Sequence, residues 1–234
     1  MTEIEFRSDF TVKLVNSTVE PDRMVVAAAR VSTEGASSLD AEEHAGLIKF
    51  LMTNRHGSPF EHNQFTFFIQ APIFVWRELM RHRIASYNEE SGRYKQLEPV
   101  FYVPGLGRPL VQTGKAGKYV FEAGSPWQHA RVAASLKDVA EHAYDDYEDL
   151  LEHGVAREVA RMCLPLNIYS SAYVTMNARG LMNFFSLRTK HEDSMFPSFP
   201  QYEIEKVALE MENLWAAEMP LTAKAFTAGR RVAP

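Results

Sequence analysis

A charged stretch from Arg81 to Tyr94 constrains this chain more than any other feature. It holds three arginines, one histidine, two glutamates and two serines. It directly follows Pro72–Met80, an apolar segment whose composition indicates burial. Asn88 and Gly92 interrupt any regular helix, so the charges cannot form a ladder of i, i+4 pairs. We therefore expect a helix that ends near Arg83 and a non-helical charged segment after it.

The arginines indicate what this segment binds. Arginine presents a flat, permanently charged fork that grips phosphate or carboxylate with two hydrogen bonds. Arg81 and Arg83 flank His82, which concentrates like charge unless an anion compensates it. We interpret the segment as a binding site for an anionic, hydrogen-bond-rich ligand such as a nucleotide. The alternative is a salt-bridged surface, the commoner origin of runs of arginine and glutamate.

Composition limits the class of protein. The chain has 234 residues, of which 46 % are hydrophobic and 24 % charged, the balance of a soluble globular protein. A net charge of −5 argues against general nucleic-acid binding. Cys163 is the single cysteine, which excludes an intramolecular disulfide. The amino terminus is unlike a signal peptide, and no run reaches the roughly 20 apolar residues of a membrane span. We expect a cytoplasmic protein without membrane partners.

Residue patterning predicts an α+β fold. Strands are expected at Phe10–Val19, Gln64–Gln70, 97–103, 118–123 and Ile168–Met176. Helices are expected at Pro21–Arg30, Ala41–Thr53, Pro72–Arg83, Ser125–Leu151, Val155–Met162, Gly180–Arg188 and Gln201–Trp215, the last continuing toward Phe226. Ser38 or Asp40 suits the cap of the second helix. Because no βαβ rhythm and no linker occur, we expect one domain over residues 1–234.

The sequence does not match the familiar motifs for dinucleotide, phosphate or zinc binding. Gly105–Leu110 lacks the third glycine of a dinucleotide-binding turn, and Gly117–Tyr119 is not a phosphate-binding loop. His56, Glu61 and His62 match no zinc-binding spacing. We therefore expect no metal, and we expect any dinucleotide to be held by arginine, histidine and backbone groups.

The charged segment also resembles a known family. It matches Arg-His-Arg-x-x-Ser-x-Asn-x-x-Ser-x-Arg, the motif of the flavin-dependent thymidylate synthases, at every fixed position. Further blocks that resemble this family are His56–His62, Ala71–Val75, Arg161–Pro165, Asn177–Arg179 with Asn183, and Phe185–Arg188. The resemblance implies a single catalytic domain with a mixed or antiparallel sheet flanked by long helices.

The resemblance also implies site residues. Contacts to FAD are implied for His56, Ser58, Arg81, His82, Arg83, Glu89, Asn177, Arg179 and Asn183. Contacts to dUMP are implied for Glu78, Arg81, Glu89, Glu90, Ser91, Gly92, Arg93, Arg161 and Arg188, with Arg93 on the phosphate. Arg188 is the implied catalytic residue, which favours ionisation at N3 of the pyrimidine. A fixed cation suits that task because it stabilises developing charge without titrating.

The reaction implied is reductive methylation of dUMP to dTMP by a methyltransferase. Methylenetetrahydrofolate would supply the carbon, and NADPH would reduce FAD. Family members are homotetramers with active sites between subunits. No catalytic cysteine belongs to the motif, and we interpret Cys163, beside Met162 and Leu164, as a small core side chain rather than a nucleophile.

Two departures from the family pattern stand out. Glu78 occupies a position where the family has a glutamine that contacts the nucleotide, and an ionised carboxylate cannot donate a hydrogen bond. The segment 189–200 is longer than usual, so His191 receives no role.

Two other functions compete with this one. A nucleotide- or RNA-binding protein could use the arginines with Tyr87 and Tyr94 as stacking platforms. An interaction protein could use the arginine–glutamate surface only to pack subunits.

Overall fold

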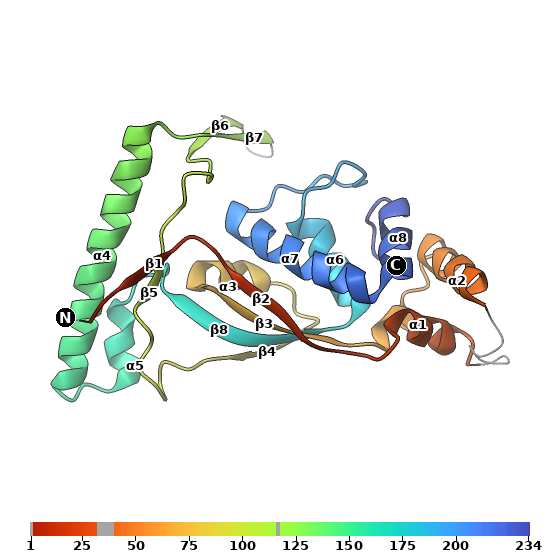
Figure 1. The fold of residues 1–234 in the computed structure, drawn as a ribbon, viewed down its shortest axis with the longest axis horizontal. Coiled ribbons are helices and arrows are strands. Elements are labelled where there is room, and N and C mark those ends of the chain that lie inside the picture. The colour runs from red at the N-terminus through yellow and green to blue at the C-terminus, as the bar shows by residue number, and fades with distance from the viewer. Residues whose placement is uncertain (1, 32–39, 116–117) are drawn as a thin grey trace. The chain divides into compact units, whose positions relative to one another are not determined.

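A computed structural model describes residues 2–31, 40–115 and 118–234 (Figure 1). Within these residues, no helix combines the length and apolar character that a membrane crossing requires. The chain divides into two compact units, each built from several stretches. Unit 1 comprises Met1–Phe10, Gln70–Leu79 and Glu89–Ala172, and unit 2 comprises Thr11–Ile69, Met80–Asn88 and Tyr173–Pro234. A single domain over residues 1–234 stays a prediction.

A four-stranded sheet has the strand order β2–β3–β8–β4. Its strands are β2 (Thr11–Ser17), β3 (Phe65–Pro72), β4 (Ser86–Glu89) and β8 (Tyr169–Met176). Burial alternates along β3, where Phe65, Phe67 and Ile69 are buried, as a strand with one covered face requires. The boundaries between the two units fall within β3, β4 and β8.

Unit 1 combines short strand pairs with one long helix. β1 (Glu5–Arg7) pairs in parallel with β5 (Val100–Tyr102), and β6 (Val111–Lys115) pairs antiparallel with β7 (Lys118–Glu122). The helical elements are α3 (Ile73–Leu79), α4 (Pro126–Glu152), α5 (Arg157–Ala160) and the 3₁₀ turn η3 (Arg161–Cys163).

Helix α4 begins where the sequence predicts. Ser125 accepts a hydrogen bond from the Gln128 amide at 3.2 Å, and the Gln128 side chain accepts one from the Ser125 amide at 2.7 Å. Tyr144 and Tyr147 on its buried face reach the backbone of Leu97: the Tyr144 hydroxyl donates to its carbonyl at 2.8 Å, and its amide donates to the Tyr147 hydroxyl at 3.2 Å. These bonds fix Leu97, which lines the pocket described below.

Unit 2 packs helices around an aromatic core. Its helical elements are α1 (Pro21–Ala29), α2 (Ala41–Thr53), η2 (Ser58–Glu61), α6 (Ala178–Arg188), α7 (Tyr202–Glu218) and α8 (Pro220–Ala228). Trp215 on α7 lies 5.5 Å from Phe185 on α6 and 6.3 Å from Phe226 on α8, measured between ring centroids. All three side chains are buried, and each such burial stabilises the fold by roughly 2–3 kcal/mol.

Helices α2 and α8 in unit 2 are capped by side chains, α2 from within its own first turn and α8 from a distant stretch of the chain. Asp40 and Glu43 form the capping box of α2, which confirms Asp40 as a predicted cap. Asp22 on α1 accepts hydrogen bonds from the amides of Leu221 and Thr222 at 2.9 and 3.0 Å, so its carboxylate caps α8.

The structure confirms the α+β class and corrects several boundaries. The predicted helix Pro72–Arg83 ends at Leu79, the predicted helix Val155–Met162 shortens to α5 with η3, and Pro220 separates α8 from α7. The strands β1, β4 and β6 were not predicted. In the segment that follows α3, the carbonyl of Ile84 lies against Gly180 of α6, where an added Cβ would stand 3.1 Å away.

Candidate active site

The predicted site residues divide between the two units, because the charged segment passes from unit 2 to unit 1 at Glu89. Unit 1 holds Glu78, Glu89, Glu90, Ser91, Gly92, Arg93 and Arg161. Unit 2 holds His56, Ser58, Arg81, His82, Arg83, Asn177, Arg179, Asn183 and Arg188.

One pocket of unit 1 gathers several predicted nucleotide ligands. It has a volume of about 320 Å³, and Glu89, Glu90, Gly92 and Arg161 line it together with apolar side chains such as Leu97. Glu78 on α3 and Arg93 are not among its lining residues. Three carboxylates, those of Glu89, Glu90 and Glu158, and one guanidinium therefore line a cavity whose remaining wall is mostly apolar, which is the usual design of a small-molecule site.

Glu89 and Glu90, two of the three carboxylates of this pocket, are held in place. Glu89 accepts a hydrogen bond from the Ser170 hydroxyl at 2.6 Å. Glu90 accepts one from the Ser171 amide at 2.9 Å and pairs with Lys95 at 2.6 Å. Hydrogen bonding to Glu90 raises the pKa of Lys95, which therefore remains charged at neutral pH.

Gly92 lets the chain approach Arg161 closely. A Cβ at this position would lie 3.2 Å from Cδ of Arg161 and 3.2 Å from the Leu97 side chain. The neighbouring Ser91 shapes the turn, since its hydroxyl accepts a hydrogen bond from the Arg93 amide at 3.2 Å. The glycine of the motif thus has a packing role beside Arg161.

Arg93 pairs with a residue that the sequence interpretation missed. Its Nε lies 2.8 Å from a carboxylate oxygen of Glu158, and both side chains are about half exposed. Glu158 also lines the pocket. Its position three residues before Arg161 on a helical segment was the signal that could have identified it. An exposed pair of this kind contributes little stability, so its effect is to orient Arg93.

In unit 2, Arg188 and His82 form one hydrogen-bonded pair. The Nε of Arg188 donates to Nε2 of His82 at 3.1 Å. Because arginine has no acceptor, His82 must accept through an unprotonated Nε2 in this arrangement. The His82 ring meets Phe184 edge-on at 4.8 Å between ring centroids. The imidazole is thereby fixed between an aromatic wall and a guanidinium.

Tyr87 supports this pair from within the motif. Its hydroxyl donates to the carbonyl of His82 at 2.9 Å, and burial raises the pKa of Tyr87 to about 12. The hydroxyl therefore stays protonated as a donor. Within unit 2, the Tyr87 side chain therefore holds the backbone of His82 in place.

Arg179 is held from two sides on α6. Its Nε donates to the carbonyl of Pro234 at 2.6 Å, and its Nη1 pairs with Glu61. Gly57 allows this approach, because a Cβ there would stand 2.6 Å from the guanidinium carbon.

Four other predicted flavin ligands lie around these elements. Asn177 caps α6 by accepting from the Gly180 amide at 2.8 Å, and Asn183 donates to the Arg179 carbonyl at 3.0 Å. His56 and Ser58 are exposed before β3. The side chains of Asn177 and Asn183 thus both hydrogen-bond to the backbone of α6.

Cys163 is not the core residue that the sequence suggested. The residue is exposed, although its Sγ donates to the Ala160 carbonyl at 3.0 Å. Partial burial of the thiol raises the pKa of Cys163, which lowers the thiolate fraction at neutral pH. In the part of the chain that the structure describes, no group of three histidine, cysteine, aspartate or glutamate side chains could hold a metal ion.

Comparison with known proteins identifies the family. The family model of the thymidylate synthase complementing protein, Thy1, matches residues 13–221. A flavin-dependent thymidylate synthase of Streptomyces coelicolor is 57 % identical, with 99 % of this chain and 96 % of the relative covered. One of Tropheryma whipplei is 54 % identical, with 98 % and 97 % covered. The chain belongs to the flavin-dependent thymidylate synthase family.

A solved structure shows that this member of the flavin-dependent thymidylate synthase family shares its fold with a known methylase. PolB of Streptomyces cacaoi, a UMP/dUMP methylase crystallised with 5-Br UMP, is 52 % identical and superposes with a TM-score of 0.92 over 99 % of each chain. Family, fold and enzyme class are thus confirmed as predicted. The competing interpretations as an RNA-binding protein or a subunit-packing protein are not supported.

The donor set of unit 2 fits the flavin cofactor that the family name specifies. Arg81 and Arg83 present exposed guanidiniums on either side of His82. Such groups offer only donors and suit a pyrophosphate, while the fixed His82–Arg188 pair offers a flat polar edge. These residues therefore match a dinucleotide with a planar ring system.

Proposed function

We propose that this flavin-dependent thymidylate synthase converts dUMP to dTMP, with methylenetetrahydrofolate as carbon donor and FAD as the cofactor that NADPH reduces. When bound, reduced FAD supplies the two electrons that a transferred methylene needs to become a methyl group. The observation that carries the proposal is the unit 1 pocket, where Glu89, Glu90, Gly92 and Arg161 come together.

The proposed nucleotide site divides its tasks by charge. Arg161, together with Arg93 outside the pocket lining, binds the phosphate, because guanidiniums grip phosphate oxygens in pairs. Glu89 and Glu90 accept hydrogen bonds from the sugar and base, as carboxylates already oriented by Ser170 and the Ser171 amide. Ser91 adds a hydroxyl in the same turn. Glu78 keeps its predicted contact to the nucleotide only as an acceptor.

The proposed catalytic residue is Arg188. Its permanent charge stabilises negative charge that develops on the pyrimidine, and it does so without giving up a proton. His82 accepts from its Nε and thereby orients the guanidinium. Arg81, His82, Arg83, Arg179 and the residues around Gly57 bind FAD.

A cysteine nucleophile is not part of this mechanism. Cys163 does not line the pocket of Glu89 and Arg161, its thiol donates to a backbone carbonyl, and its raised pKa disfavours the thiolate. The pyrimidine is instead activated by charge stabilisation and by its position beside the reduced cofactor.

We further propose a cytoplasmic homotetramer with active sites formed between subunits. Large apolar side chains on the surface of both units support an assembly. Trp127 on α4 is 73 % exposed and Phe196 is 69 % exposed.

UMP is a second candidate substrate, because PolB, at 52 % identity, is a UMP/dUMP methylase. Parallel assays with equal concentrations of the two nucleotides measure the preference through kcat/KM. We expect methylation of dUMP, and the UMP assay shows whether the ribose hydroxyl is tolerated.

The absorption spectrum of the purified protein tests the cofactor directly. We expect the flavin bands of bound FAD, bleached by NADPH and restored after addition of dUMP and methylenetetrahydrofolate. A folded preparation that neither carries nor takes up FAD would refute the proposal.

A further inference from the structure

Unit 2 contains a second, larger pocket that none of the predicted site residues lines. It has a volume of about 780 Å³ and lies between α7, α8, the segment 189–193 and the turn after α8. Its basic lining residues are Lys190, His191, Lys224, Arg230 and Arg231, and its acidic ones are Asp193 and Glu212. With histidine neutral, four positive charges face two negative ones. The pocket therefore carries an excess of positive charge.

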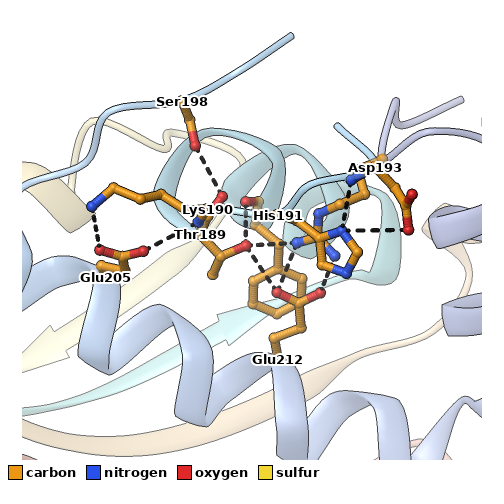
Figure 2. Close-up of polar contacts among 9 residues, drawn as sticks. Thr189, Lys190, His191, Asp193, Ser198, Glu205 and Glu212 are labelled. Carbon is orange, nitrogen blue, oxygen red and sulfur yellow. Dashed lines mark hydrogen bonds and ion pairs between the residues drawn. The ribbon is translucent and has the colours of Figure 1, made fainter. Parts of the chain in front are cut away.

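Three of the basic residues are already paired, as Figure 2 shows in part. Arg231 binds both oxygens of Glu212, at 2.6 and 2.8 Å. Lys190 pairs with Glu205 at 3.1 Å, and His191 lies 3.7 Å from Asp193. These pairs build the wall of the pocket and neutralise that part of it.

The other two basic residues of the pocket, Lys224 and Arg230, are not part of such pairs in the part of the chain that the structure describes. Within the described residues, neither side chain has a carboxylate oxygen within 4.0 Å, and both are exposed. Both cations line the same pocket, and an oxyanion bound there would supply the counter-charge that the described residues do not provide.

The backbone holds Arg230 in place at an energetic cost. Arg230 and Arg231 both adopt left-handed φ angles, 57° and 58°, which L-residues other than glycine, asparagine and aspartate rarely use. Three bonds maintain the turn: the amide of Arg230 donates to the Thr227 carbonyl, the amide of Arg231 donates to the Phe226 carbonyl, and the amide of Met195 donates to the Arg230 carbonyl. Strained residues that the surrounding structure enforces occur preferentially at ligand sites.

One buried polar group among the lining residues of the pocket also lacks a hydrogen-bond partner within the described part of the chain. Arg231 is only 3 % exposed, yet its Nε has no hydrogen-bond partner among the described atoms. The walls from α7 and α8 include Leu209, Ala216 and Ala223. A ligand with one anionic end and a small apolar body matches this combination of walls and charges.

We propose that this pocket binds a small organic oxyanion, a phosphate or carboxylate attached to a short apolar body. Lys224 and Arg230 bind the oxyanion, and the apolar side chains of α7 and α8 contact the body. The site is separate from the proposed dUMP and FAD sites, since the two sets of residues do not overlap.

Calorimetric titration of the full chain tests this proposal, with FAD and dUMP in excess so that anions cannot enter those sites. The probes are phenyl phosphate, phenylacetate and inorganic phosphate. We expect one phenyl phosphate or phenylacetate per chain, with inorganic phosphate binding more weakly because it lacks the apolar body. The stronger of the two aromatic probes identifies the preferred oxyanion.

Variants assign the binding to the pocket. Lys224→Gln with Arg230→Gln should weaken the better aromatic probe by about tenfold, the size expected for lost charge-assisted contacts. Lys49→Gln, an exposed lysine on α2, is the matched control and should bind like the parent. Unchanged melting temperatures establish that the double variant is folded. No binding of any probe by the parent, or equal binding by the double variant, would overturn the proposal.

Discussion

The buried pair of Arg231 and Glu212 offers the sharpest test of the packing in unit 2. The Arg231 side chain is 2 % exposed and that of Glu212 is 17 % exposed. Glu212→Ala would leave a desolvated guanidinium whose remaining hydrogen-bond partner among the described residues is the Thr189 hydroxyl at 2.6 Å. Breaking a buried ion pair from one side costs about 3–5 kcal/mol. With a urea slope of about 2.5 kcal/mol/M, the unfolding midpoint should fall by roughly 1–2 M.

Two further variants decide whether the loss comes from the stranded charge. Arg231→Met combined with Glu212→Leu removes both charges and should recover most of the stability, because apolar replacement of a buried pair is often neutral or better. Glu205→Ala removes the partner of Lys190, whose side chain is 53 % exposed, so the remaining charge is hydrated and the loss should be less than about 1 kcal/mol. Equilibrium urea unfolding followed by circular dichroism measures all of them. If Glu212→Ala costs no more than Glu205→Ala, or the double variant is no better than the single one, the reasoning is wrong.

Three other predictions concern unit 1. Cys163→Ala should retain turnover with FAD and dUMP, and a folded, FAD-loaded variant without activity would instead indicate a thiolate mechanism. Gly92→Ala should weaken dUMP binding by about tenfold in a titration while FAD content stays constant, because the added methyl group presses on Arg161; unchanged dUMP affinity would contradict that contact. Hydrogen bonding from Arg7 lowers the pKa of Asp9, so this pair stabilises the fold above the ordinary carboxyl pKa and the contribution disappears as pH falls through the lowered value. Asp9→Asn should therefore reduce the acid dependence of unfolding, and an unaltered pH profile would count against the pair.

Local signals in the sequence predicted much of the fold. Asp40 and Ser125 cap their helices as expected, since a cap depends on residues within one turn. The end of α3 at Leu79 was missed because the four residues from Met80 to Arg83 include no glycine or proline that would mark a helix end. Pro220 was underestimated as the break between α7 and α8.

The candidate site, like the fold, could be predicted from the sequence only in part. The motif supplied Arg93, and the further blocks that resemble the family supplied Arg161 and Arg188, but the pairs of Arg93 with Glu158 and of Arg188 with His82 are tertiary contacts. That Glu158 pairs with Arg93, and His82 with Arg188, became evident only when separate stretches of chain were placed together.

The segment 189–200, which the sequence left without a role, contributes Thr189, Lys190, His191 and Asp193 to the larger pocket of unit 2. Its length relative to the family pattern was visible in the sequence. Its partners Glu205, Glu212 and Arg231 were not, because they lie on later elements.

Formation of dTMP in a single turnover tests the central claim most directly. The protein is loaded with FAD, reduced with NADPH without oxygen, and mixed with dUMP and methylenetetrahydrofolate labelled with deuterium on the transferred carbon. Mass spectrometry of the quenched mixture should show labelled dTMP in an amount approaching the bound FAD. A folded, fully FAD-loaded and NADPH-reduced protein that leaves dUMP unchanged would contradict the account.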